Sequence, residues 1–538
     1  MSTTGGGRRV QVPLQAVGWV VAVAALAVGT AIRLWLLYHL PFTSDEAVVG
    51  LMARRISHGQ MFTFYWGQSY GGVEPYLLVV WSAVVGSGPV ALNALPVVLS
   101  AVAAVLAGRI TLRMVDPSFR FVAWAVAAAL WVWPDVVAYN SARELGFRGV
   151  TVVAGLAAVL LAMRVRTRPT IPDAVGLGLA LGIGWWSSPE IVYFAVPVAV
   201  IVVIRRIGLT RWLVIAASGL IGALPWLATN LATGFASLRE SSSPEYVHRT
   251  YGGRLSVFAH DAFPMMLGLR LPLSGAWLWG RAGQALYVLA VIVIVAAVAY
   301  GWFGRSSADL VVPVRALAWG VLVFPFIFAA FPATSFWQQG QYGVFIVPLV
   351  AALVTAALTT GLFRVGVPSW VTPALIVVLV TAIGASSFDR AWLGGHRSFT
   401  SGWHGLPVAM QEAVAGVRAS GVRFAYAQYW VAYDLDYLDR RLVVADPYTD
   451  RWVGQYQEVR RSADPAWIFY APDQHALGAT TFSSGADGPY GYPEALFLSK
   501  LAALDDPYRV VHAGVLDVVF PLRNVTQEQV GIPSAYWP

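Results

Sequence analysis

The sequence predicts a polytopic α-helical membrane protein that carries a small α/β domain at its C-terminal end. Of its 538 residues, 57% are hydrophobic and 12% are charged, whereas soluble domains are about 45–50% apolar and about 25% charged. The apolar residues fall in runs of about 20, the length that crosses a hydrocarbon core. These observations exclude a soluble enzyme.

About 11 runs are long enough to span a membrane. The first covers residues 16–38 and follows Arg8 and Arg9, and because it is longer than a signal-peptide core we expect an uncleaved anchor. The run at 76–86 would rise only about 16 Å as a helix, so we expect it to lie at the interface. The other expected spans lie near residues 89–110, 119–139, 148–163, 173–188, 190–205, 211–230, 284–303, 312–331, 342–362 and 367–386.

The arginines between these runs predict the orientation of the chain. With residues 76–86 outside the membrane, they gather on one side, which the positive-inside rule makes the cytoplasm. The N-terminus is then cytoplasmic, and the first outer loop (39–88) and a long outer loop (232–283) face the other side. We expect a membrane domain over 1–386 and an extracytoplasmic domain over 387–538. The arginines concerned are Arg8, Arg9, Arg109, Arg113, Arg120, Arg164, Arg166, Arg168, Arg205, Arg206, Arg211, Arg305 and Arg364.

Composition also removes several functional classes. The net charge of +8 comes from arginines spread between apolar runs, which disfavours nucleic-acid binding. There is no cysteine, so disulfides and thiolate metal sites are excluded. The only lysine, Lys500, does not follow a glycine-rich turn, so there is no P-loop.

The C-terminal part has the pattern of a small α/β domain. Short β-patterned runs occur at 422–427, 441–445, 467–470 and 508–520, and a helical pattern occupies 429–438. About 150 residues are enough for one such domain.

The first outer loop holds an acidic pair, Asp45 and Glu46, at the start of a helical pattern. The apolar residues of this pattern share one face, so we expect an amphipathic helix on the outer membrane surface. Thr43 and Glu46 fit a capping box, which would explain the acids structurally. A carboxylate here could instead act as a general base or hold a divalent metal against a phosphate, and Asp45 fits both roles.

Aromatic and amide side chains continue this loop. An aromatic belt at the membrane interface would explain them, and so would a surface for sugar rings and hydroxyls. The candidate substrate-binding residues here are Tyr65, Trp66, Gln68, Tyr70 and Glu74.

The order of these features resembles the polyprenyl-phosphate-dependent glycosyltransferases of the GT-C superfamily. The bacterial relatives of protein O-mannosyltransferases and the lipid A aminoarabinose transferases are the most similar groups. The similarity extends to residues 182–190, to Gln341-Tyr342 and to residues 426–435.

This resemblance implies a GT-C-like fold and a glycosyltransferase. The donor would be a sugar on polyprenyl phosphate, and the acceptor an extracytoplasmic glycan, lipid or protein of the cell envelope. It also implies that Asp45 is the catalytic base, that Glu46 assists it, and that Asp45 is the residue to hold a Mg²⁺ or Mn²⁺ ion if one is used.

One departure concerns the residue that binds the lipid phosphate. Relatives often have Arg-Tyr where this chain has Gln341-Tyr342. Arg143, Arg148 and Arg270 are the candidate replacements, although each could equally be a solvated arginine. Glu144 is a second acid for acceptor or metal binding, or one half of a surface ion pair.

Two other functions fit a chain with many spans. A lipid-linked glycan flippase or other transporter would place paired polar groups at mid-membrane, which this sequence lacks. A non-catalytic scaffold of the cell envelope is the third possible function.

Overall fold

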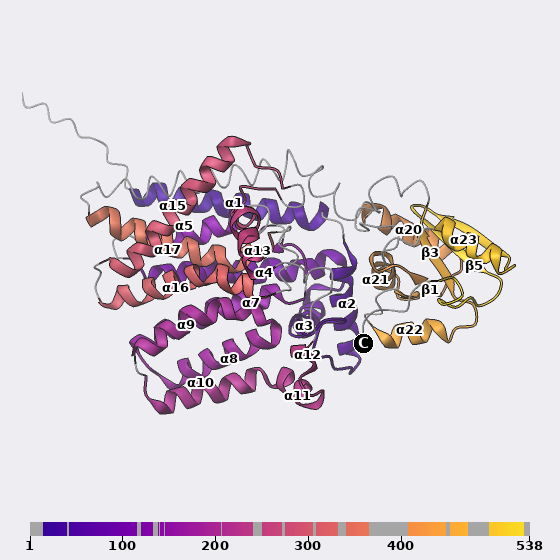
Figure 1. Cartoon of the computed structure of the whole chain (residues 1–538), viewed down its shortest axis with the longest axis horizontal. Coiled ribbons are helices and arrows are strands. Elements are labelled where there is room, and N and C mark those ends of the chain that lie inside the picture. The colour runs from indigo at the N-terminus through magenta and orange to yellow at the C-terminus, as the bar shows by residue number, and fades with distance from the viewer. Residues whose placement is uncertain are drawn as a thin grey trace, which may run out of the picture.

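The computed structural model describes most of the chain as a helical bundle with a sheet domain at one end (Figure 1). The described residues are 14–39, 42–115, 120–132, 138, 140–144, 146–205, 207–239, 250–271, 275–304, 308–331, 340–364, 407–447, 452–471 and 494–531.

Helices occupy ten of the segments expected to span the membrane, and the expected span at 367–386 lies outside the described residues. These helices are α1 (Leu14–His39), α4 (Pro89–Leu112), α5 (Arg120–Val132), α7 (Arg148–Thr167), α8 (Ile171–Ser187), α9 (Val192–Arg205), α10 (Leu209–Gly222) with α11 (Leu224–Ala232), α15 (Arg281–Phe303), α16 (Ala308–Ala330) and α17 (Gly343–Arg364).

Within the described residues, four helices are long and apolar enough to cross a membrane, or five if a bent pair is counted as one span. The bent pair is α10 with α11, which meet at 66°. Pro225 lies in the first turn of α11, and because proline cannot donate the backbone hydrogen bond that would continue α10, the helix breaks here.

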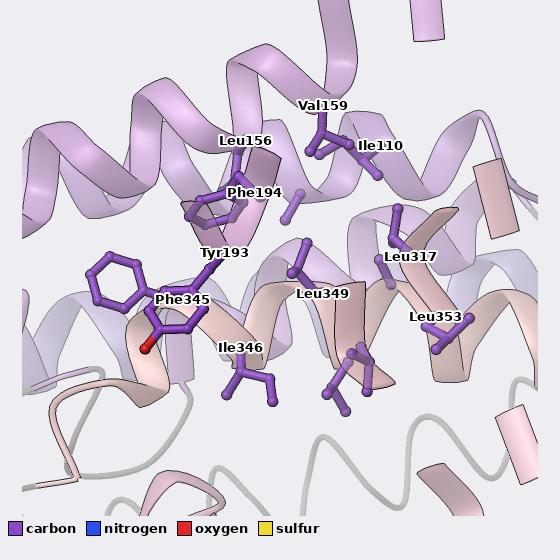
Figure 2. Packing of buried hydrophobic residues seen from close by; sticks show 14 of the residues in the cluster. Ile110, Leu156, Val159, Tyr193, Phe194, Leu317, Phe345, Ile346, Leu349 and Leu353 are labelled. Atoms are coloured by element: carbon purple, nitrogen blue, oxygen red, sulfur yellow. The ribbon is translucent and has the colours of Figure 1, made fainter. Parts of the chain in front are cut away.

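Aromatic and small residues pack the bundle. Tyr193 stacks on Phe324 with ring centroids 4.1 Å apart and lies beside Phe345 (Figure 2). Between α8 and α10, a Cβ atom on Gly178 would come within 2.0 Å of Ser218 Oγ. Glycine therefore allows these two backbones to approach closely, as in many membrane bundles.

Shorter helices lie between the long ones. The first outer loop forms α2 (Ser44–Ser57) and α3 (Glu74–Val85). The long outer loop forms α12 (Ala236–Arg239), α13 (Tyr251–Val257), the π-helical turn η4 (Phe258–Ala262) and α14 (Phe263–Met266), and the 3₁₀ turn η2 (Pro189–Ile191) joins α8 to α9.

The C-terminal part forms a five-stranded mixed sheet in the order β2-β1-β3-β5-β4. β1 pairs in parallel with β2 and β3, β5 is antiparallel to β3, and β4 and β5 form a hairpin. The strands are β1 (Phe424–Ala427), β2 (Val443–Ala445), β3 (Ala466–Tyr470), β4 (Tyr508–Ala513) and β5 (Leu516–Pro521). The predicted β runs and the α/β character of this part are thus confirmed.

Helices cover both faces of this sheet. Alternate residues of β1 point to opposite faces: Ala425 packs with α20 (Pro407–Ala419) and α21 (Tyr429–Leu438), and Tyr426 packs with α22 (Val453–Arg460) and α23 (Glu494–Ala503). The expected boundary at 386/387 lies outside the described residues.

Candidate active site

Helix α2 begins at a buried polar cluster built around Glu46. The side chain of Glu46 accepts a hydrogen bond from the backbone N–H of Thr43 at 2.7 Å and completes a capping box with this residue. Arg143 donates to both carboxylate oxygens of Glu46, at 2.7 and 3.0 Å, and to Thr43 Oγ1 at 2.5 Å. Because all three side chains are buried, this cluster fixes the start of α2 and attaches it to the segment just before α7.

Asp45, the neighbouring acid, has different surroundings. Its side chain is half-buried, and Oδ1 accepts a hydrogen bond from the Tyr429 hydroxyl at 2.6 Å. The backbone carbonyl of Asp45 accepts from the Tyr65 hydroxyl at 3.0 Å. Of the predicted acidic pair, Asp45 is therefore the carboxylate that is not enclosed in an ion pair.

The surface of α2 is covered by protein. Val48, Leu51 and Met52 are buried and join a cluster that includes Tyr433 and Tyr437 of α21. The apolar face of α2, which we expected to rest on the membrane surface, instead packs against α21 of the C-terminal domain (Figure 1).

The aromatic loop after α2 is folded against the same junction. Trp66 is buried and stacks on Trp452 of the C-terminal domain, with ring centroids 4.4 Å apart. Tyr70 makes an edge contact with Phe147 at 4.8 Å. Gln68 is half-buried, and its backbone N–H donates to the Tyr65 carbonyl at 2.9 Å.

Two predicted substrate-binding acids are buried side by side. Glu74 accepts a hydrogen bond from the Val150 N–H at 2.8 Å, and Glu144 accepts one from the Gly146 N–H at 3.0 Å. Burial and the neighbouring Glu74 raise the pKa of Glu144 well above its usual range. These carboxyl groups thus connect α3 to the start of α7 inside the protein.

A small cavity of about 60 Å³ lies between α4, α5, α7 and α17, and Arg148 lines it together with Asn140 and Ser141. The Nε atom of Arg148 is buried and has no hydrogen-bond partner. The rest of the lining is mostly apolar: Pro96, Leu99, Ser100, Ala103, Ala104, Leu130, Gly149, Val152, Val344 and Pro348.

Gln341 and Tyr342 lie at the head of α17, close to this arginine. Both are buried, and the charges of Glu190 and Arg148 act on the Tyr342 hydroxyl. The structure therefore brings Tyr342, Arg148 and Glu190 together, and Glu190 is a residue of this group that sequence reasoning did not select.

Arg270 is held within its own segment. It pairs with Asp261, donates to the Gly275 carbonyl at 2.5 Å and to the His260 carbonyl at 2.9 Å, and lies over Trp277. None of these partners belongs to the first outer loop.

No family model and no curated protein sequence matches the chain. Its structure aligns with the crystal structure of ArnT from Cupriavidus metallidurans bound to undecaprenyl phosphate, with a TM-score of 0.51 and 14% identity, over 94% of this chain and 98% of that chain. The chain therefore has the same overall fold as ArnT. The predicted resemblance is thus confirmed at the level of the fold.

Two further GT-C structures, both of oligosaccharyltransferases from Archaeoglobus fulgidus, align less well. AglB in complex with an inhibitory peptide and a dolichol-phosphate gives a TM-score of 0.45 and 12% identity, over 84% of this chain and 69% of that one. A complex with Zn and sulfate gives 0.45 and 14%, over 83% and 67%.

Among the described residues, no three His, Asp or Glu side chains gather where they could hold a metal ion. Glu46, the adjacent acid, is already bonded to Arg143. A divalent ion at Asp45 would therefore lack a second carboxylate from the pair.

Sequence reasoning also missed Tyr429 and Trp452, which the C-terminal domain contributes to the first loop. One signal existed: Tyr429, Tyr433 and Tyr437 recur every four residues, so they share one face of a helix whose opposite face is also apolar. A helix with apolar residues on two opposite faces is expected to pack against partners on both of them.

Proposed function

We propose that this protein is an integral membrane glycosyltransferase that moves a sugar from a polyprenyl-phosphate donor to an extracytoplasmic acceptor of the cell envelope, which is a glycan, a lipid or a protein. The observation that carries the proposal is the presence of two groups with the chemistry that this transfer needs, a carboxylate outside any ion pair and an arginine at a cavity. Asp45 offers a half-buried carboxylate, and Arg148 offers a guanidinium at an apolar cavity.

Arg148 would hold the donor phosphate. Its buried Nε is unpartnered, and an arginine binds phosphate oxygens with charge-assisted hydrogen bonds. The apolar lining from α4 and α17 continues away from it, which suits the first isoprene units of the carrier. Tyr342 would border the same phosphate. The ArnT structure bound to undecaprenyl phosphate supports a carrier of this class.

Asp45 would act as the general base. It would take the proton from an acceptor hydroxyl as that oxygen forms a bond to the anomeric carbon. The bond from this carbon to the phosphate oxygen breaks, and the electron pair leaves with polyprenyl phosphate, whose charge Arg148 stabilises. This displacement uses no nucleotide. Tyr65, Gln68 and Tyr70 would line the path of the sugar and the acceptor.

We also propose the orientation that this chemistry requires, with the N-terminus in the cytoplasm and residues 387–538 outside. Arg109, Arg113 and Arg164 support it, because they gather with Asp173 at the ends of α4 and α7 and the start of α8, and the positive-inside rule assigns such a cluster to the cytoplasm. Reporter fusions after Arg113 and Arg168 should be cytoplasmic, and a fusion after Ser387 should be extracytoplasmic.

The test is the substitution Asp45→Asn. Asparagine replaces aspartate well near a helix N-terminus but cannot act as a base. We expect transfer to fall by about 10²- to 10⁴-fold. The matched control is Asp173→Asn, because Asp173 also lies in the first turn of a helix and belongs to a cap, but it sits at the opposite end of the bundle.

The assay uses proteoliposomes with undecaprenyl-phosphate-linked glucose, mannose or arabinose, and an envelope extract from cells that lack the gene as acceptor. Release of undecaprenyl phosphate is measured by mass spectrometry. Asp45→Asn protein with more than about a third of parent activity would exclude general-base catalysis by this residue. An unchanged envelope glycan profile in cells without the gene would favour a flippase or a scaffold.

A further inference from the structure

Helix α21 of the C-terminal domain is fitted closely onto α2. Tyr437 approaches α2 at Gly50, where an added Cβ would come within 2.2 Å of the tyrosine ring. The Tyr437 hydroxyl donates to the Ser87 carbonyl at 2.6 Å, and its ring lies 5.1 Å from that of Phe42. Because the Tyr437 ring is packed and its hydroxyl is hydrogen-bonded, the position of α21 along α2 is fixed.

A second group of contacts holds the two parts together further from Asp45. Arg54 donates to the backbone carbonyl of Tyr437 at 3.1 Å. Arg55 lies over the ring of Trp452, 3.9 Å from its centroid, and Trp66 stacks on the same ring. The first outer loop and the C-terminal domain are therefore joined along the whole length of α2.

Tyr429 occupies the end of this interface that faces Asp45. Its side chain is 1% exposed, and its ring is held between Trp430 and Tyr433, with centroids 4.7 and 5.4 Å away. A ring held in this way can point its hydroxyl in few directions. The hydroxyl donates to Asp45 Oδ1 at 2.6 Å.

We propose that Tyr429 is a positioning residue for the reaction, so that the C-terminal domain completes the active site of the membrane domain. This inference rests on the proposed function of Asp45. A hydrogen bond to Oδ1 orients the carboxylate, so Oδ2 is directed to the acceptor hydroxyl. The rate that a general base gives depends strongly on its orientation, because a displacement of the base by about 1 Å can lower the rate about 10²-fold.

The substitution Tyr429→Phe tests this role in the full chain, since it keeps the packed ring and removes only the hydroxyl. The matched control is Tyr437→Phe, which removes a hydroxyl whose hydrogen bond has the same length, from the same face of the same helix. Each variant loses one hydrogen bond at the interface, but only Tyr429→Phe loses the bond to Asp45.

We expect Tyr429→Phe to lower kcat about tenfold or more, because a carboxylate that has lost its orienting hydrogen bond is less often aligned with the acceptor hydroxyl. Binding of undecaprenyl phosphate, measured by native mass spectrometry, should not change. Tyr437→Phe should keep the parent kcat and have a similar melting temperature to Tyr429→Phe.

The double variant Asp45→Asn with Tyr429→Phe provides a readout that a purely structural role would not give. If Tyr429 acts through Asp45, the double variant should be no slower than Asp45→Asn alone. If Asp45→Asn is inactive but Tyr429→Phe and Tyr437→Phe have equal kcat values, the positioning role is overturned and the proposed function stands. If Asp45→Asn keeps full activity, both proposals fall.

Discussion

Arg143 lies just before α7 and Arg148 is its first residue, yet the structure gives them opposite surroundings. Arg143 is enclosed: it donates to both oxygens of Glu46 and to Thr43. Arg148 lines a cavity, and its buried Nε has no partner. An arginine whose N–H groups are bonded to protein acceptors stabilises the fold. An arginine with an unbonded N–H group at a cavity can bind a ligand. Both were equal candidates from sequence, and their partners separate them.

The largest effect should come from breaking the enclosed pair. Arg143→Ala leaves the buried Glu46 carboxylate unpaired, which should cost about 3–5 kcal/mol of unfolding free energy. Arg164→Ala is the control, because its side chain is 51% exposed beside Asp173 and such pairs contribute at most about 1 kcal/mol. Thermal unfolding in detergent compares the two. Equal melting temperatures of the two variants would show that the buried Arg143–Glu46 pair stabilises the protein no more than the exposed Arg164–Asp173 pair does.

The same ion pair makes Glu46 unsuitable as a control position for Asp45, because Glu46 is the partner of Arg143. We therefore expect Glu46→Gln to destabilise the protein, and any loss of transfer in this variant has to be corrected for the amount of folded protein.

A smaller, more specific effect should follow from Arg148→Ala. If Arg148 holds the donor phosphate, affinity for undecaprenyl phosphate should fall about ten- to a hundredfold, since a hydrogen bond to a charged group is worth about 1.5–3 kcal/mol. Native mass spectrometry measures the affinity. Arg270→Ala is the control, because the guanidinium of Arg270 is bound to Asp261 and to carbonyls. Equal affinity losses in the two variants would refute a specific phosphate site at Arg148.

The smallest expected effect concerns Asp436, a buried carboxyl group that, among the described residues, has no arginine ion pair of the kind that Glu46 has with Arg143. Burial raises the pKa of Asp436 to about 7, and Gln455 donates to its Oδ2 at 2.8 Å. At pH values between the ordinary pKa of an aspartate and this raised pKa, Asp436 keeps its proton in the folded protein but releases it in the unfolded chain. Stability should therefore fall as the pH rises through this window.

Asp436→Asn should remove this contribution, which is at most about 1.4 kcal/mol per pH unit. Melting temperatures of the full chain at pH 5 and pH 7 measure it. The exposed Asp505, replaced by asparagine, is the control. A parent and an Asp436→Asn variant with the same change between the two pH values would contradict the prediction.

Local features of the fold could be predicted from the sequence. The helical pattern at 429–438 coincides with α21, the run at 508–520 became the β4–β5 hairpin, and Thr43 with Glu46 form the predicted capping box. Each depends on neighbours in the chain, and such interactions leave periodic patterns. The GT-C resemblance was likewise carried by short motifs.

Contacts between distant segments could not be predicted in this way. The covering of α2 by α21 brings residues 45 and 429 together, and no local pattern records which two apolar faces meet. For the same reason, the sequence could not distinguish Arg143 from Arg148. Both are arginines near an outer loop, and only the folded position of Glu46 decides which of them is neutralised.

The hydrogen bond between Asp45 and Tyr429 also sets an order of events during biosynthesis. Its two residues are 384 positions apart, and at about 5–20 residues per second the ribosome needs about 20 to 80 s to extend the chain from one to the other. Throughout this interval the first loop is already made, but its carboxylate lacks the phenol that orients it. A nascent or truncated chain is thus held in an unassembled state until its last domain has folded.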